Sequence, residues 1–287
     1  MLTFKEFIAE GGNIKIGHHE AGVIDVSPKT RQSAADDISN GLHELHKSFH
    51  KAHNEHLFGT DAKALKTGSA YSGSTSHLMD SSIPHEDLIK HKKSFGDVDV
   101  KVPREHMDKL HAHLQPGLKF GKYTVLGVNK GGGEHHLLAK HENGQNHQFD
   151  FEPSTYEKDE PSRFDRLSHS SNWEDVKSGF KGYHHKILLN AIGGNKHKFS
   201  TLYGVGKREG EPDWERDQGK MANRLFGSKA TSDTVQSFKS LTAAIKKHVP
   251  GANHQAIFDK FKTSSTTNKG VDSAAAISHL QTELGLK

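Results

Sequence analysis

The sequence predicts an α+β protein in two parts, a small mixed sheet with helices on one face followed by a mostly helical domain. Three observations indicate this. Residues 97–102 alternate charged and apolar side chains, as a half-buried strand does. Three further strand-like runs follow between glycine turns, and the chain from residue 214 onward places apolar residues at helical spacing. We expect the sheet domain in residues 11–155 and the helical domain in 156–287.

Composition limits the class of protein. The 287 residues are enough for two modest domains, but hydrophobic residues make up only 32% and the mean hydropathy is −0.75, so we expect polar loops at the edges. Cysteine is absent, which excludes disulfides, thiolate zinc sites and cysteine nucleophiles. No apolar run approaches the ~20 residues of a membrane span. The net charge of +4 permits contact with nucleic acid without requiring it.

The first ten residues, MLTFKEFIAE, form a short amphipathic stretch before a Gly-Gly pair that ends any helix. They lack the long apolar region of a secretory signal. The stretch resembles the capsid-targeting peptide of internal head proteins of myoviruses, which a prohead protease cuts after Ile/Leu-x-Glu. The resemblance implies cleavage after Glu10, packaging in the phage virion and delivery to the host cytoplasm with the DNA. The alternative is an ordinary amphipathic helix of a cytoplasmic protein.

A short strand is expected at 22–26, before a helix over 33–57 whose apolar residues recur at helical spacing. Four histidines at intervals of three, four and three share another face of that helix. Imidazoles at this spacing can chelate zinc or nickel. The alternative is the polar shoulder of an amphipathic helix, because the chain has 24 histidines and no acidic or cysteine partner nearby strengthens the metal interpretation. These histidines are His43, His46, His50 and His53.

Carboxylates gather on two predicted strands. Asp97 and Asp99 lie two apart on one strand and therefore share a face. Asp150 lies between two phenylalanines, so a second strand carries a third carboxylate with a hydrophobic opposite face. Upstream lie two glycine–serine pairs, Gly68-Ser69 and Gly73-Ser74, whose N–H groups and hydroxyls can cradle phosphates if the turn opens a helix.

These features together predict a site for cations and phosphate. Hard cations such as magnesium prefer carboxylate oxygens, and two of them roughly 3.5–4 Å apart can polarise a phosphoryl group and activate a hydroxyl. An Asp-x-Asp pair alone is common on exposed strands. The upstream turn and the third acid are what favour a catalytic interpretation.

The pattern resembles the nucleotidyltransferases of the DNA polymerase beta superfamily, whose signature is a helix-opening Gly-Ser, a nearby Gly-Ser/Thr, an Asp-x-Asp strand and a later Asp on a strand. The resemblance covers about residues 66–153 and implies a nucleotidyltransferase-type sheet. It also implies transfer of a nucleoside monophosphate from a nucleoside triphosphate such as ATP to a hydroxyl, with two Mg²⁺ ions or Mn²⁺ in their place.

The same resemblance assigns roles to residues. Asp97 and Asp99 would bind both ions, and Asp150 would hold the ion that activates the hydroxyl. The phosphates would lie on Gly68, Ser69, Gly73 and Ser74. The family's spacing is shorter, however, so the polar stretch 77–94 is an insertion that must loop out for the turn to reach Asp97.

A helix is expected over 104–115, followed by the three strand-like runs. The triple glycine between the first two runs predicts a hairpin turn rather than a nucleotide loop, because no helix signal follows it. Glu152 shares the face of Asp150 and is either a secondary acid or a residue at a loop edge. The three runs are 122–128, 135–140 and 147–151.

The region after residue 153 offers weaker signals. Arg163 and Arg166 are candidates for triphosphate contact or ordinary solvated charges. Apolar spacing predicts a helix over 173–192, and a hairpin is expected over 196–206. In the superfamily a helix after the third acid commonly supplies a nucleotide-binding lysine, and the resemblance favours Lys186 for this role. Less favoured positions are Lys177 and Lys181.

The acceptor of the nucleotide stays open: the end of a transfer RNA, another nucleic acid, a protein side chain or a small molecule. Six lysines of the helical domain either line a nucleic-acid backbone or belong to solvated helix faces. A competing function is a non-enzymatic internal head protein, or a nucleic-acid-binding protein, on a degenerate nucleotidyltransferase scaffold. The lysines are Lys229, Lys239, Lys246, Lys247, Lys260 and Lys262.

The capsid-targeting interpretation predicts a new N-terminus. Mass spectrometry of the protein taken from virions should find Gly11 as its first residue, because cleavage follows Glu10. An intact Met1, or absence of the protein from the particles, would contradict this interpretation.

Overall fold

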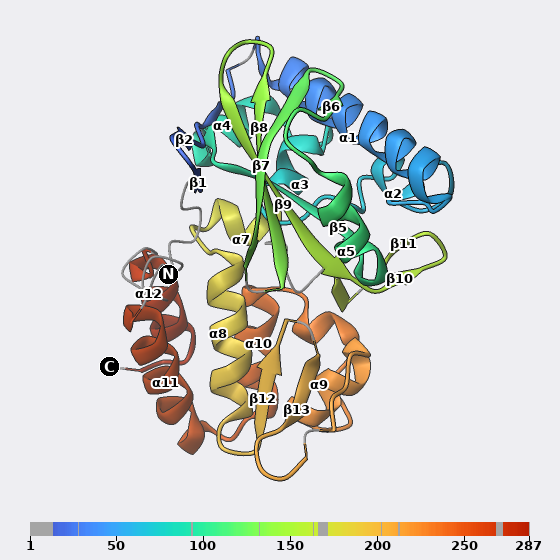
Figure 1. The fold of residues 1–287 in the computed structure, drawn as a ribbon. Helices are drawn as coiled ribbons and strands as arrows, with labels where there is room; N and C mark the ends of the chain where they lie inside the picture. The colour runs from blue at the N-terminus through green and yellow to red at the C-terminus, as the bar shows by residue number, and fades with distance from the viewer. Residues whose placement is uncertain are drawn as a thin grey trace. The chain divides into compact units, whose positions relative to one another are not determined.

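The computed structural model describes residues 14–286 except 28, 93, 132, 163, 166–171, 202, 212 and 268–271. The chain divides into two compact units, residues 1–162 and 163–287. The first unit contains a mixed, curled five-stranded sheet with helices, and the C-terminal region is mostly helical (Figure 1). The α+β class expected from the sequence is therefore confirmed. The expected cleavage site at Glu10 lies outside the described residues.

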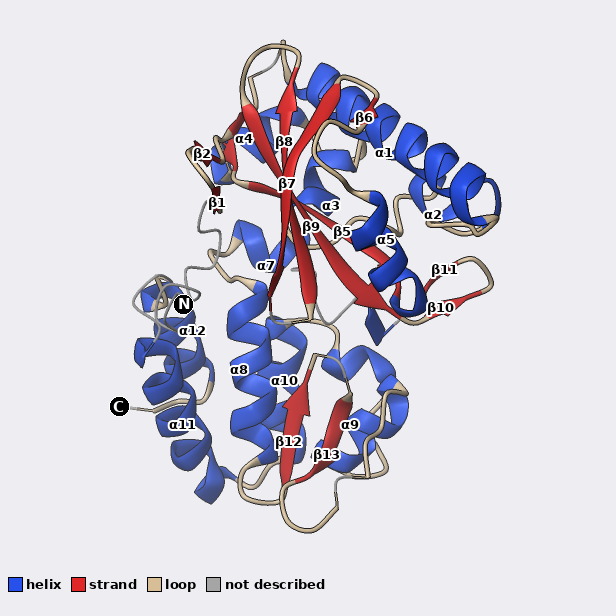
Figure 2. Ribbon diagram, in the orientation of Figure 1, coloured by secondary structure: helices blue, strands red, loops and turns tan. Residues whose placement is uncertain are grey.

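The central sheet has the strand order β5-β9-β8-β7-β6 (Figure 2). β5 is an edge strand and runs parallel to β9, whereas the other neighbours are antiparallel. The three expected strand-like runs form β7, β8 and β9. Gly131 at the end of β7 pairs with Glu134 at the start of β8, which confirms a hairpin turn at the triple glycine. The strands are β5 Asp97–Pro103, β6 Lys119–Phe120, β7 Tyr123–Gly131, β8 Glu134–His141 and β9 Asn146–Ser154.

One face of the sheet forms the core of the first unit. Val98 and Phe149 are paired on this face, and both are fully buried. Helix α1, Arg31–His53, packs against the same face with its apolar stripe. A Cβ added to Gly41 of α1 would lie only 2.9 Å from the ring of Tyr123, so the helix needs a glycine at this contact. The helix ends earlier than expected, because Asn54 adopts a left-handed conformation with φ 55°.

The expected insertion does not form an open loop. It folds into two short helices, α3 Thr75–Met79 and α4 His85–His91, and into β4 Ser94–Phe95, which pairs with β3 Ile24–Asp25. The Arg31 guanidinium donates to the backbone oxygens of Asp80 and Ile83, each at 2.7 Å. These bonds hold the segment against the start of α1.

Smaller elements complete the first unit. The helix expected over 104–115 begins as a 3₁₀ turn and continues as α5, so its existence is confirmed. The pairs β1–β2 and β10–β11 form two-stranded sheets. Their bounds are β1 Lys15–Ile16, β2 His19–Glu20, η2 Thr60–Ala62, α2 Lys63–Lys66, η3 Arg104–His106, α5 Met107–His113, β10 Tyr156–Glu157 and β11 Glu160–Pro161.

The second unit has a helical core around Phe238 and Phe261, both fully buried. The expected hairpin forms from β12 and β13. The expected helix over 173–192 is in fact two helices, because Gly179 has a φ of 80° and ends the first of them. The elements are α7 Trp173–Lys177, α8 Gly182–Gly193, β12 His197–Ser200, β13 Gly204–Lys207, α9 Gln218–Phe226, η4 Ser232–Val235, α10 Phe238–His248, η5 Gly251–Asn253, α11 His254–Thr267 and α12 Ala274–Glu283.

Among the described residues, no helix combines the length and the apolar character that crossing a membrane requires.

Candidate functional site

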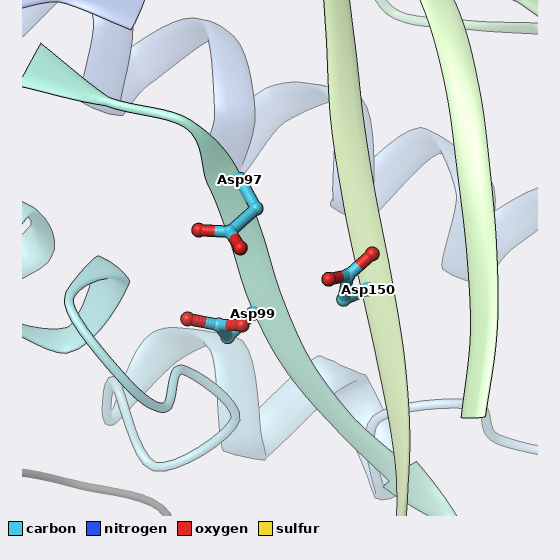
Figure 3. A group of neighbouring side chains, drawn as sticks. All are labelled: Asp97, Asp99 and Asp150. Carbon is cyan, nitrogen blue, oxygen red and sulfur yellow. The ribbon is translucent and has the colours of Figure 1, made fainter. Parts of the chain in front are cut away.

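Three carboxylates predicted from the sequence lie together on the polar face of the central sheet. Asp97 and Asp99 project from β5, and Asp150 lies beside them on β9 (Figure 3). The parallel register pairs Asp99 directly with Asp150. One oxygen from each of the three carboxylates lies within 4.8 Å of the others. The three side chains are therefore close enough to bind one cation together.

The electrostatics of this cluster are unfavourable when all three groups are ionised. Burial raises the pKa of Asp97, and the charge of Asp150 adds to the shift. Burial also raises the pKa of Asp99 well above its ordinary range, with further contributions from Asp97, Glu152 and Asp150. The positive charge of Lys92 opposes both shifts. A divalent cation would remove this repulsion, and carboxylate oxygens are the donors that Mg²⁺ prefers.

Two side chains that sequence reasoning missed hold Asp150 in place. His136 on β8 is paired with Asp150, and its Nδ1 lies 2.8 Å from Asp150 Oδ1. The Nε2 of Gln148 donates to both Asp150 oxygens, at 2.9 and 3.0 Å. The bond to Asp150 raises the pKa of His136. Since β8 lies on the side of β9 away from β5, the His136 bond holds Asp150 Oδ1 on the β8 side.

A buried ion pair lies one step further along the same two strands. Lys101, only 1% exposed, donates to Glu152 Oε2 at 2.9 Å, and Ser72 donates to the same oxygen at 2.6 Å. Glu152 therefore lies within β9 and not at a loop edge, and a role as a secondary acid stays a prediction. Lys101 is the last charged residue of the alternating run 97–102, and that alternation did not indicate that its side chain is buried.

The segment before α3 pairs with the open edge of β5. The backbone N–H of Ser72 donates to Asp99 O at 3.2 Å, and the N–H of Lys101 donates to Ala70 O at 2.7 Å. The Asp99 N–H in turn donates to the hydroxyl of Thr75 at 2.9 Å. These bonds bring the predicted turn to the acids.

The two glycine–serine pairs differ in position. Gly73 touches the acid cluster, since a Cβ added there would lie on the Asp99 carboxylate, 2.1 Å from its Oδ2. Ser74 is the N-cap of α3, and its hydroxyl makes no capping hydrogen bond. Gly68 and Ser69, by contrast, follow the end of α2 and do not open a helix. The Ser69 hydroxyl bonds to Thr67 at 2.9 Å and lies 3.4 Å from Glu160 Oε1.

The other predicted contacts lie elsewhere. Lys186 lies on α8 of the second unit and is half-buried. Arg163 and Arg166 lie outside the described residues, and Lys177 and Lys181 flank the break between α7 and α8. A role for any of them in nucleotide binding stays a prediction.

The histidine face of α1 makes local structural contacts. Burial lowers the pKa of His46 to about 4, and its Nδ1 accepts the backbone N–H of Phe58 at 3.2 Å. His50 stacks on His56, with ring centroids 4.4 Å apart, and His53 packs against Phe49. Within the described part of the chain, Asp97, Asp99 and Asp150 are the one group of three or more histidine, cysteine, aspartate or glutamate side chains close enough to share a metal ion. The histidines of α1 do not form such a group.

A scan against protein-family models, a search of curated proteins and a search of solved structures each find no match to this chain. The resemblance to nucleotidyltransferases therefore stays a prediction from the sequence motifs.

The raised pKa values predict that Asp99→Asn stabilises the fold in the absence of divalent cations. In the wild type, ionising Asp99 costs folding free energy once the pH exceeds its ordinary pKa of 3.8, and the cost grows until the pH passes the raised pKa. Asparagine cannot ionise. The thermal midpoint in EDTA should therefore rise relative to wild type at pH 7, and the gain should disappear below about pH 4.

The exposed Glu142→Gln variant is the control, because it removes a carboxylate from a surface turn of the same unit. An equal midpoint for Asp99→Asn and wild type at pH 7 would contradict the prediction.

Lys101→Met should destabilise the protein, because it leaves the carboxylate of Glu152 buried without its cation. We expect a loss of about 3–5 kcal/mol in urea unfolding, and a partial recovery when Glu152→Leu is added. The matched control is Lys140→Met on β8, where the lysine is exposed. Equal losses in the two lysine variants would show that the ion pair does not stabilise the fold.

Proposed function

We propose that the first unit is a metal-dependent nucleotidyltransferase that moves a nucleoside monophosphate from a nucleoside triphosphate to a hydroxyl. One observation carries the proposal: Asp97, Asp99 and Asp150 approach within 4.8 Å on two parallel strands, next to a glycine–serine turn that opens a helix. An acid cluster alone would suit cation binding of any kind. The turn adds backbone N–H groups where the phosphates of a nucleotide would lie.

The proposed roles follow from position. Asp97 and Asp99 lie on one strand and would hold two Mg²⁺ ions, or Mn²⁺, while Asp150 would hold the ion nearest the acceptor hydroxyl. Gly73 and Ser74 would bind the phosphates, because Gly73 lies against Asp99 and the Ser74 hydroxyl makes no capping bond. Gly68 and Ser69 would support this turn from the end of α2.

The donor set fits these ions. All three ligands are carboxylates, and burial and mutual repulsion raise the pKa values of Asp97 and Asp99 even though the charge of Lys92 opposes both shifts. When bound, the ions would neutralise charge on the phosphates and activate the hydroxyl.

The reaction balances without a redox partner. A bond forms between the acceptor oxygen and the α-phosphorus, and the bond from that phosphorus to the bridging oxygen breaks. Pyrophosphate leaves, and the hydroxyl proton is released to water. The chain's own contribution is to orient the carboxylates, through His136 and Gln148 on Asp150, and to keep the turn against β5.

The acceptor and the place of action belong to the proposal as well. The proposed acceptor is a nucleic acid such as a transfer RNA. If residues 1–10 direct packaging, the activity would act in the host after injection. The competing proposal keeps the same fold as a non-enzymatic internal head protein or nucleic-acid-binding scaffold.

Asp97→Asn and Asp150→Asn should each lower nucleotide incorporation by about 100-fold or more, because each removes a charge that the transition state needs. Incorporation is measured by incubating the protein with labelled nucleoside triphosphates, Mg²⁺ and a bacterial lysate, then fractionating the label. Glu142→Gln is the control and should keep wild-type incorporation.

Undiminished labelling in both aspartate variants would remove the enzyme assignment. Calorimetry with each nucleoside triphosphate and Mg²⁺ separates the scaffold alternative. Metal-dependent binding that disappears in Asp97→Asn supports the enzyme, and no binding supports the scaffold.

A further inference from the structure

Gln148 connects Asp150 to the first described residues of the chain. It lies on β9 two residues before Asp150, on the same face, and is only 4% exposed. Its Oε1 accepts a hydrogen bond from the backbone N–H of Ile14 at 2.9 Å, while its Nε2 donates to Asp150. The amide thus bridges a backbone donor and a carboxylate.

The contact with Ile14 determines which way this amide faces. A backbone N–H can only donate, so it requires the oxygen of Gln148, and an ionised carboxylate can only accept, so it requires the NH₂ group. Turning the amide over would place donor against donor and acceptor against acceptor. The Ile14 N–H therefore holds the NH₂ group of Gln148 on Asp150.

Residues 14–22, which we call the N-terminal strap, are held on this face by contacts of their own. Ile16 occupies the space over Gly127 of β7, where a Cβ would lie 2.7 Å from Ile16 Cγ2. The Ala21 N–H donates to Ile14 O at 3.1 Å, and the Gly22 N–H donates to Asn146 O at 2.8 Å. Packing and the strap's own bonds therefore place Ile14, independently of Gln148.

The strand register explains why the strap reaches the acids. Gly127, Leu138, Gln148 and Asp97 are paired in turn across β7, β8, β9 and β5. They form a row of the polar face, adjacent to the row that holds Asp150. A strap that crosses the sheet at Gly127 lies along the row that contains Gln148.

We propose that Gln148 is a positioning residue for Asp150 and that the N-terminal strap sets the cation affinity of the acid cluster through Gln148. This rests on the cation binding of the proposed function. Without the Ile14 bond, only Asp150 orients the Gln148 amide, and the donor that fixes the orientation of the Asp150 carboxylate is held less firmly. Losing such a partner of a ligand costs typically about 10–100-fold in metal affinity.

The test is a Mn²⁺ titration of the full chain. Binding is measured by calorimetry and by the electron paramagnetic resonance signal of free Mn²⁺. Gln148→Leu should weaken binding about tenfold. Ile14→Pro, which removes the backbone N–H, should also weaken Mn²⁺ binding. Ile14→Ala keeps the N–H and should bind as wild type does.

A double variant shows whether Ile14 acts through Gln148. Ile14→Pro should weaken Mn²⁺ binding in the wild-type background and have no further effect in the Gln148→Leu background. Equal affinity for Ile14→Pro and Ile14→Ala would overturn the proposal, as would additive losses in the double variant. Ile14 lies outside the sheet, so its variants remain informative even if Gln148→Leu fails to fold.

The two proposals fail in different ways. If wild type binds Mn²⁺ and Asp99→Asn does not, the acid cluster is a cation site, and an unaffected Ile14→Pro then removes only the role of the strap. If wild type binds no Mn²⁺, both the strap proposal and the metal-dependent function are wrong.

Discussion

The parallel pairing of β5 with β9 is the interaction on which the first unit depends. It sets Asp99 opposite Asp150 and, one step along, Lys101 opposite Glu152. A pair of like charges and a pair of opposite charges therefore lie next to each other on the same face. Slipping the register by one residue would turn an acid into the core in place of Phe149 or Phe151, both fully buried. The apolar face thus fixes the geometry of the polar one.

The closeness of the three acids lowers the folding stability, and the hydrogen bonds and the Lys101–Glu152 ion pair around them offset part of this loss. The raised pKa values of Asp97 and Asp99 reflect carboxylates that are too close and too little solvated. Gln148 and His136 supply hydrogen-bonding partners for the third acid, Asp150. Crowded and poorly solvated carboxylates with raised pKa values are the groups whose repulsion the proposed cation would relieve.

Local patterns in the sequence predicted much of this arrangement. Alternation on 97–102 and the phenylalanines around Asp150 placed three acids on the polar faces of two strands. Gln148 lies two residues before Asp150 on the same strand, so the same alternation could have placed it beside that acid. The partners on other strands could not be predicted, because they depend on which strands pair. His136 is one of 24 histidines, and only its place opposite Asp150 in the sheet distinguishes it from the others. Lys101 resembles a solvent-facing lysine until the segment 70–72 covers the edge of β5.

The covered edge of β5 also explains how the long segment between Ser74 and Asp97 can coexist with a compact site. An edge strand exposes unpaired backbone groups, and here Ala70, Ser72 and Thr75 bond to them. The turn at residues 70–75 is thus held by its hydrogen bonds to β5 and not by the segment that connects the turn to β5. The length of that link then matters little for the site, since Arg31 fixes the inserted segment separately. The position of Gly73 against the Asp99 carboxylate therefore depends on β5 directly and not on the residues between Ser74 and Asp97.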